Sequence, residues 1–180
     1  MRVISGIYKG RNLIAPTDNE VRPTSAMVKE AIFGKLQFQI ADTLFLDLFS
    51  GTGAMGIEAI SRGAREVYFA DNSYKSIKLI ESNLKKIGVE ANVINASYEI
   101  TLKMMKDKQF DFIFIDPPYA LDCIDKILEL VTLNNVLSID GIIIFEHLKE
   151  KVLKLASTSY IIIDEKKYSG TMVSYIKRNI

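Results

Sequence analysis

The sequence predicts an α/β fold with a mostly parallel sheet and helices on both of its faces. Short apolar runs alternate with helix-type segments over most of the chain, and the runs have the composition of strands buried on both faces. The strands are expected near 43–48, 66–70, 91–95, 111–115 and 141–146, and the helices near 54–62, 73–87, 98–107 and 121–132.

The N-terminal part does not follow this alternation. Residues 2–8 and 12–15 are expected to pair as a β-hairpin around a Lys-Gly turn. Thr24 or Ser25 is expected to cap a helix that reaches about Phe38, because a short hydroxyl side chain can accept a hydrogen bond from the first helical turn.

At 180 residues the chain has the size of one domain, residues 1–180. We divide it into an N-terminal extension, residues 1–38, and a core, residues 42–180. The core ends in two strand-like runs, 159–164 and 172–176, which predict an antiparallel hairpin.

Composition favours a globular protein that does not span a membrane. Hydrophobic residues make up 48% of the chain, yet no run of 18 apolar residues occurs and the N-terminus lacks the apolar core of a signal peptide. The single Cys123 excludes an internal disulfide and fits a reducing cytoplasm. Cys123 and the lone His147 are expected to be packing residues, and the absence of a Cys/His cluster predicts no metal site.

The most specific motif is Asp116-Pro117-Pro118-Tyr119, which follows the apolar run 110–115. Proline cannot continue a strand ladder, so the motif predicts a stiff loop at the carboxyl end of a strand, where open α/β sheets bind ligands. The carboxylate and a backbone carbonyl can accept both hydrogens of an exocyclic amine while the tyrosine ring stacks on the base. The motif therefore predicts a site for a flat nitrogenous base; the alternative is a strand-to-helix turn with an exposed tyrosine.

A glycine-rich loop follows the first core strand. Gly51, Gly53 and Gly56 have the spacing G-x-G-x-x-G, and a helix is expected directly after them. Glycines permit a tight turn and a close approach of the backbone to a ligand. We expect a side chain at Gly53 to fill the space of that ligand. The spacing alone fits either NAD or S-adenosylmethionine (SAM).

Two acidic residues bear on this choice. Asp71 follows the loop at about 20 residues, the spacing at which an acid meets the ribose hydroxyls of either cofactor. Asp47 precedes the loop, where it would repel a pyrophosphate but attract the cationic amino group of a methionine. Asp47 therefore favours SAM.

Together these motifs resemble those of the class I SAM-dependent amino-methyltransferases. The whole chain resembles the RsmD family, bacterial enzymes that methylate guanine N2 in small-subunit (16S) ribosomal RNA. The closer resemblance rests on segments 1–11, 21–25, 28–33, 58–64 and 168–171. It implies a Rossmann-like class I methyltransferase fold with a seven-stranded sheet, and 16S rRNA within a small subunit or an assembly intermediate as the partner.

The resemblance also implies roles for single residues. The catalytic residues would be Asp116, Pro117, Pro118 and Tyr119, and SAM would be bound by Asp47, Phe49, Ser50, Gly51, Thr52, Gly53, Gly56, Asp71, Asn72 and Ser97. Many family members carry an acid after the third strand, near the adenine ring. Here Ser97 or Asn95 would have to supply that hydrogen bond instead.

Basic residues collect in the N-terminal extension, although the net charge of the chain is only +1. Arg2, Lys9, Arg11, Arg22 and Thr24 are expected to contact the RNA, mainly its phosphates. The alternative is a solvated charged surface.

Three other functions remain open. A DNA adenine-N6 methyltransferase could use the same four residues of 116–119, but the chain has no room for an added target-recognition region. A protein glutamine methyltransferase faces the same chemistry at an amide nitrogen. A SAM- or RNA-binding module without activity is the alternative from a different class, and the intact motif disfavours it.

Overall fold

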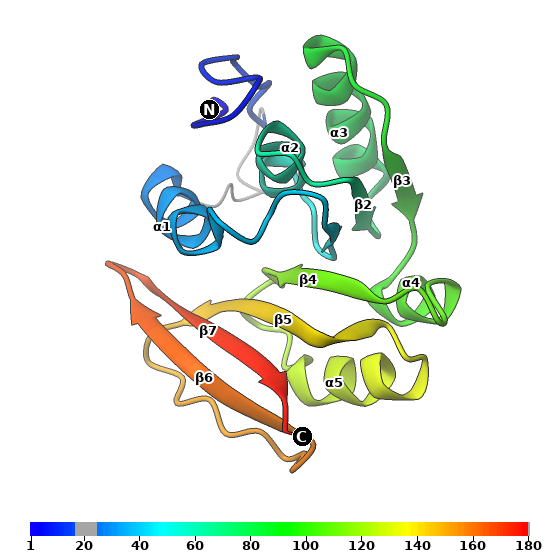
Figure 1. Ribbon diagram of the computed structural model, residues 1–180, viewed down its shortest axis with the longest axis vertical. Coiled ribbons are helices and arrows are strands. Elements are labelled where there is room, and N and C mark those ends of the chain that lie inside the picture. Colours follow the sequence, from blue (N-terminus) through cyan, green and yellow to red (C-terminus); the bar gives the residue numbers. More distant parts are fainter. Residues whose placement is uncertain (17–24, 180) are drawn as a thin grey trace.

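One seven-stranded sheet organises the chain, as the sequence predicts (Figure 1). The computed structural model describes residues 1–16 and 25–179. The strands are β1 (Leu44–Asp47), β2 (Glu66–Asp71), β3 (Asn92–Asn95), β4 (Phe110–Ile115), β5 (Leu137–Leu148), β6 (Tyr160–Lys167) and β7 (Thr171–Arg178). The helices are α1 (Ala26–Leu36), α2 (Ala54–Ser61), α3 (Tyr74–Ile87), α4 (Tyr98–Met104) and α5 (Ile124–Leu133).

The strand order, β3-β2-β1-β4-β5-β7-β6, creates a crevice in the middle of the sheet. From β1 the chain proceeds outward through β2 to β3, and then returns to place β4 on the other side of β1. All four pairs between β3 and β5 are parallel, so these strands end at the same edge. The reversal of winding between β1 and β4 opens space for a ligand beyond their carboxyl ends.

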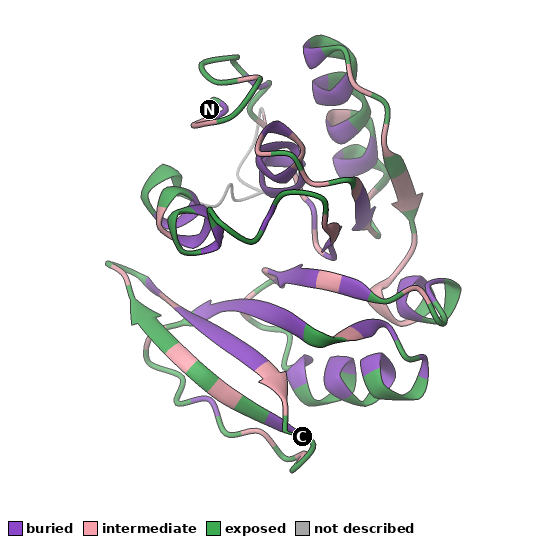
Figure 2. Cartoon of the chain, viewed as in Figure 1, coloured by how far each residue is buried: buried purple, intermediate pink, exposed green. Residues whose placement is uncertain are grey.

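The helices form two layers that cover the two faces of the sheet (Figure 1). Alternate residues of each strand pack into different clusters: Phe45 and Phe69 face α1, α2 and α3, whereas Leu46 and Tyr68 face α4 and α5. Figure 2 shows the central strands almost continuously buried, which agrees with their apolar composition. No helix in residues 1–16 or 25–179 combines the length and apolarity that a bilayer span needs.

The C-terminal strands form the predicted antiparallel hairpin, in which β7 pairs with both β5 and β6. β5 is longer than predicted and contains His147. The imidazole Nε2 lies 2.8 Å from the Ser174 hydroxyl on β7, and the ring stacks on Phe145. Burial lowers the pKa of His147, so this side chain acts as a packed, neutral part of the sheet.

The N-terminal hairpin is a wrong prediction in its regular form. Residues 1–16 contain one antiparallel bridge, between Arg2 and Asn12, and no strand. The backbone N–H groups of residues 4, 5, 7 and 8 turn instead toward α2, where Glu58 and Ser61 accept them. The chain comes so close there that a Cβ at Gly6, which has φ +83°, would lie 1.7 Å from the Ser61 carbonyl oxygen.

Ser25 caps α1, because its hydroxyl accepts a hydrogen bond from the Val28 N–H. The other predicted cap, Thr24, and the expected RNA contact Arg22 lie outside the described residues. Val3 and Leu13 pack in the same apolar cluster as Val28 and Ile57, so the described N-terminal residues share a core with the sheet.

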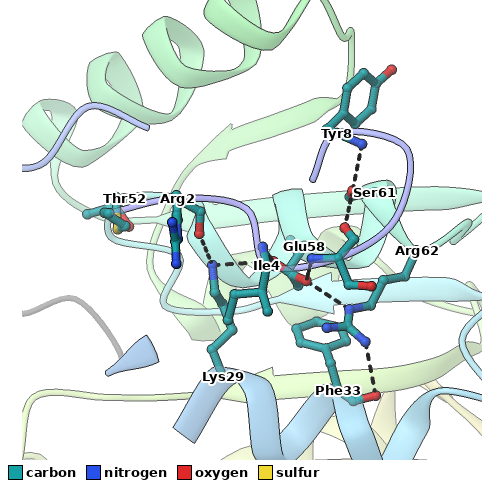
Figure 3. A network of polar contacts seen from close by, with 12 residues as sticks. Arg2, Ile4, Tyr8, Lys29, Phe33, Thr52, Glu58, Ser61 and Arg62 are labelled. Carbon is teal, nitrogen blue, oxygen red and sulfur yellow. Dashed lines mark hydrogen bonds and ion pairs between the residues drawn. The ribbon is translucent and has the colours of Figure 1, made fainter. Parts of the chain in front are cut away.

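A buried cluster of charges holds the N-terminal segment in place (Figure 3). Glu58, which is 0% exposed, accepts the Ile4 N–H at 2.8 Å and the Ser5 N–H at 3.0 Å. Its carboxylate pairs with Arg62 at 2.8 Å and with Lys29 at 3.4 Å, and the Lys29 ammonium also donates to the Arg2 carbonyl at 2.9 Å. One carboxylate thus compensates two cations and two backbone donors from three separate segments.

We expect Glu58→Gln to destabilise the fold by about 3–5 kcal/mol, because it leaves the buried Lys29 without its counter-charge. Urea unfolding measures the loss, and hydrogen exchange of the Ile4 and Ser5 amides reports whether the N-terminal segment detaches. The matched control is Glu81→Gln, whose carboxylate pairs with Lys78 on the surface of α3. Equal stabilities of the two variants would contradict the role given to Glu58.

Candidate functional site

A cavity of about 630 Å³ lies beyond the carboxyl ends of β1, β2, β4 and β5. Its walls come from the glycine-rich loop, the end of β2, the Asp116–Tyr119 loop, the end of β5, the start of α1 and the turn between β6 and β7. Of the predicted SAM and catalytic residues, those that line it are Asp47, Phe49, Ser50, Gly51, Thr52, Asp71, Asn72, Asp116, Pro117, Pro118 and Tyr119. The structure therefore brings most of the predicted site together.

Ser50 fastens the glycine-rich loop to β2. Its hydroxyl donates to the Asp47 carbonyl at 2.6 Å and accepts the Ala70 N–H at 2.9 Å, while its own N–H donates to the Ala70 carbonyl at 3.0 Å. The Ser50 hydroxyl is thus engaged within the protein. Its contribution is to fix the path of the loop along the cavity.

The next two loop residues are held from other elements. Asp71 accepts the Gly51 N–H at 2.9 Å with one carboxylate oxygen and the Ser73 N–H at 2.9 Å with the other. Asn83 of α3, which is fully buried, donates to the Thr52 carbonyl at 3.0 Å and accepts the Ile14 N–H at 2.6 Å. Asn83 therefore joins the N-terminal segment to the loop.

The sequence reasoning missed Asn83, although a signal was present. The residue lies on the inner stripe of α3, among Ile77, Ile80, Leu84 and Ile87. A single amide among apolar residues at helical spacing indicates a buried polar contact, since an unpaired buried amide would be costly.

The structure gives a different explanation for the presence of glycine at two positions of the loop, Gly53 and Gly56. Gly53 has φ +76°, and a Cβ there would point at Ile80 and Phe69 in the core and not at the cavity. A Cβ at Gly56 would lie 2.2 Å from the Phe69 ring. Neither residue lines the cavity. These glycines allow the loop conformation and the packing of α2 on the sheet, so the expected steric role of Gly53 against the ligand is wrong.

Asp47 is a buried acid at the start of the glycine-rich loop. It is 1% exposed, and its Oδ2 accepts the Gly56 N–H at 3.0 Å. Its Oδ1 is buried and has no hydrogen-bond partner among the described residues. Burial raises the pKa of Asp47 to about 7, against the opposing effect of the Gly56 hydrogen bond. An orphaned, desolvated carboxylate oxygen beside the cavity is suited to a cationic group.

Ser97, one candidate for the adenine contact, does not line the cavity. It caps α4 by accepting the Ile100 N–H at 3.5 Å. Asn95, the other candidate, donates to the Asp71 carbonyl at 3.0 Å and is also outside the lining. Phe49 lines the cavity and presents an aromatic ring there. The centroid of this ring lies 5.8 Å from the centroid of the Tyr98 ring.

The Asp116–Tyr119 loop leaves β4 without forming further strand or helix. Asp116 and Tyr119 are half-buried and Pro117 is buried, and all of them line the cavity. The Pro118 carbonyl accepts the Leu121 N–H at 2.8 Å, which closes a turn. No described residue donates to the Pro117 carbonyl, so this acceptor stays available beside the Asp116 carboxylate.

The opposite wall was not predicted as part of the site. It consists of Ser25, Met27 and Val28 at the start of α1, Glu146 at the end of β5, and residues 168–171 in the turn between β6 and β7. These segments are far apart in the sequence. Ser25, Val28 and residues 168–171 belonged to segments that carried the family resemblance, but none of them was assigned to the site. Cys123 lies outside this lining, and burial raises the pKa of its thiol to about 11, which disfavours a nucleophilic role.

The basic residues of the N-terminal part divide into two groups. Arg2, Lys9 and Arg11 are exposed. Lys29 is 2% exposed and Lys35 pairs with Asp164, so neither is a simple surface charge. Met1, next to Arg2 in the chain, reaches the cavity wall, because its sulfur lies 3.5 Å from the Thr52 hydroxyl, whereas Arg11 lies over the ring of Tyr8, which is bound to Ser61 at the end of α2. No group of three or more metal-ligating side chains occurs within the described ranges.

A sequence model of the family described as "Conserved hypothetical protein 95" matches residues 1–177. The chain belongs to this family. "Ribosomal RNA small subunit methyltransferase D" of Haemophilus influenzae is 32% identical over 179 residues, covering 97% of this chain and 91% of the relative. YlbH of Bacillus subtilis is 36% identical over 182 residues, 99% of each chain. The resemblance to the RsmD family is therefore confirmed.

Solved structures of family relatives have the same fold. The structure of YhhF from Escherichia coli aligns with a TM-score of 0.89 at 26% identity, covering 99% of this chain and 97% of that one. The match to the family model and the similarity to this structure both extend over nearly the whole chain.

The titration of Asp47 predicts a specific dependence of stability on pH. Because the folded-state pKa lies near 7 and the ordinary value is 3.8, the folded protein holds a proton that the unfolded chain has lost between these limits. The free energy of unfolding should therefore fall as the pH rises from about 4 to about 7. Urea unfolding across this range should show a flatter profile for Asp47→Asn, which mimics the protonated acid.

The control for this experiment is Asp140→Asn, at an exposed position of β5. It should keep the profile of the parent protein. A parent-like profile in Asp47→Asn would show that Asp47 is ionised throughout and would contradict its desolvation.

Proposed function

We propose that this protein is a SAM-dependent methyltransferase that modifies the exocyclic N2 of a guanine in small-subunit (16S) ribosomal RNA. One observation carries the proposal: a buried carboxylate suited to a cation, Asp47, and an amine-orienting loop, Asp116–Tyr119, line the same cavity. The name of the Haemophilus influenzae relative, which refers to small-subunit rRNA methylation, supports the substrate class.

The residues on the glycine-loop side fit SAM. The orphaned Oδ1 of Asp47 can accept from the ammonium of the methionine moiety, and such a contact would compensate the burial of this acid. Asp71 and Asn72 line the cavity at the end of β2, where ribose hydroxyls are bound in related sheet topologies. When bound, SAM supplies an electrophilic methyl group on a sulfonium centre.

The Asp116–Tyr119 loop prepares the nucleophile. A guanine N2 amine is a poor nucleophile because its lone pair is delocalised into the ring. Asp116 and the Pro117 carbonyl accept the two N–H groups and draw the nitrogen toward tetrahedral geometry, which localises the lone pair for bond formation. Tyr119 stacks on the face of a base turned out of its helix or loop. The protein thus contributes positioning and electrostatics, and the amine loses its proton readily once it is methylated.

The RNA is met outside the cavity. The exposed Arg2, Lys9 and Arg11 lie on the N-terminal segment, whose first residue reaches Thr52 at the cavity wall, and these side chains can contact phosphates while a base enters. Because one small domain with a net charge of +1 binds naked RNA weakly, we expect a small subunit or its assembly intermediate in the cytoplasm to be the acceptor.

Tritiated SAM, offered with total RNA, DNA and ribosomal subunits, tests the proposal when the labelled nucleosides are identified. Label in N2-methylguanosine of small-subunit RNA is the expected result. Label in N6-methyladenine of DNA or in a protein glutamine would overturn the substrate. Binding of SAM without any transfer would indicate a binding module.

Asp116→Ala should lower the rate of methyl transfer by at least about 100-fold, the scale for losing an acceptor that acts in the transition state. SAM affinity, measured by calorimetry, should stay unchanged because Asp116 contacts the other substrate. Tyr119→Phe, which keeps the ring, is the matched variant and should retain most activity. A normal single-turnover rate in Asp116→Ala would refute the amine-orienting role.

Replacing Arg2, Lys9 and Arg11 with alanine together should weaken RNA binding and flatten its salt dependence. Each lost phosphate contact lowers the slope of log affinity against log salt by about 0.7–0.9. SAM affinity serves as the internal control and should not change. Alanine at the exposed Lys126 of α5 should leave the slope as in the parent. An unaltered slope in the triple variant would place the RNA on another surface.

A further inference from the structure

Glu146 is a second buried carboxylate beside the catalytic loop. It lies at the end of β5, is 5% exposed and lines the same cavity as Asp116. The register brings the two acids together: Ile115 of β4 is paired with Phe145 of β5, and Asp116 and Glu146 are the next residues along these parallel strands.

The alternation of side chains places both acids toward the same face. Phe114 and Ile144, two residues before Asp116 and Glu146, pack in the cluster under α1, α2 and α3, whereas Ile115 and Phe145 pack in the opposite cluster. The negative charge of Glu146 also contributes to the raised pKa of Tyr168, after burial and Asp164, so Glu146 lies close to the turn that forms the far wall.

An acceptor for the exocyclic amine does not by itself distinguish guanine. Adenine and cytosine also carry an exocyclic amine that Asp116 and the Pro117 carbonyl could hold. Guanine differs at the neighbouring ring position, because its N1 carries a hydrogen, whereas the N1 of adenine and the N3 of cytosine carry a lone pair. A carboxylate at this position accepts from guanine and repels the other two bases.

We propose that Glu146 is the residue that specifies guanine, by accepting the N1–H of the base whose N2 amine is held by Asp116. Two neighbouring acceptors, one directly after β4 and one on β5, then match the two adjacent donors on the Watson–Crick edge of guanine. The low exposure of Glu146 strengthens this discrimination, since a base that leaves a buried carboxylate facing a lone pair binds poorly. The assignment rests on the proposed function and adds the group that reads the base.

The test compares the parent enzyme with Glu146→Gln on two methyl acceptors, one with guanosine and one with 2-aminopurine riboside at the target position. Small-subunit particles lacking the modification are prepared with guanosine or with 2-aminopurine riboside at the mapped target position. 2-Aminopurine keeps the 2-amino group but has no N1–H. With guanosine particles, Glu146→Gln should lower kcat/KM by about 10- to 100-fold, the range of one base-specific contact. SAM affinity should not change, and Glu129→Gln, at an exposed residue of α5, should behave as the parent.

The 2-aminopurine particles separate base reading from a structural role. The kcat/KM of the parent enzyme should be lower on these particles than on guanosine particles by a similar factor. The kcat/KM of Glu146→Gln should not fall below that of the parent on 2-aminopurine particles, because the N1–H contact is already absent. Equal losses in the variant on both acceptors, or no loss on guanosine, would overturn the assignment. If Glu146→Gln fails to fold, the parent decides alone: equal rates on both acceptors refute the proposal, and a slowing of at least about 10-fold supports it. A parent enzyme that labels no guanosine at all would instead refute the proposed function.

Discussion

The parallel pairing of β1 with β4 is the constraint on which the site depends. In this register Asp47 is opposite Phe114, so the end of β1 and the Asp116 loop open into one cavity. The two strands are separated by about 60 residues of chain that form α2, β2, α3, β3 and α4. Were the order of strands different, Asp47 and Asp116 would lie apart along the carboxyl edge of the sheet and could not line one cavity.

The cavity wall is rigid because neighbouring elements hold it through hydrogen bonds. β2 holds Ser50 and Gly51, through Ala70 and Asp71, and α3 holds Thr52 through Asn83. Asn83 also binds residue 14, and Glu58 binds residues 4 and 5. The N-terminal segment is therefore not a loose arm beside the fold. A loop held in this way need not reorganise when a ligand binds, which lowers the entropic cost of binding.

The sequence was sufficient to predict the sheet, the order of its elements and the two loops that face the cavity. These features depend on local patterns: apolar runs, a glycine spacing and a strand that ends in two prolines. The contacts of Glu58 and Asn83, and the position of Glu146 on the cavity wall, could not be predicted because each depends on segments far away in the chain. For Gly53 the sequence indicated the need for glycine, but not the neighbours that a side chain there would meet. A Cβ built at this position would face Ile80 of α3, and this depends on how α3 packs.

The charges of this small protein differ between the cavity and the surface outside it. Among the residues that the structure describes, the charged residues of the wall are four acids, Asp47, Asp71, Asp116 and Glu146, and one base, Lys75. A pyrophosphate or an RNA phosphate would be repelled from such a wall, whereas a cationic ligand and the donor-rich edge of a base are attracted. The exposed Arg2, Lys9 and Arg11 stand outside it. In the proposed function, this separation would keep the RNA backbone at the surface while the base enters the cavity.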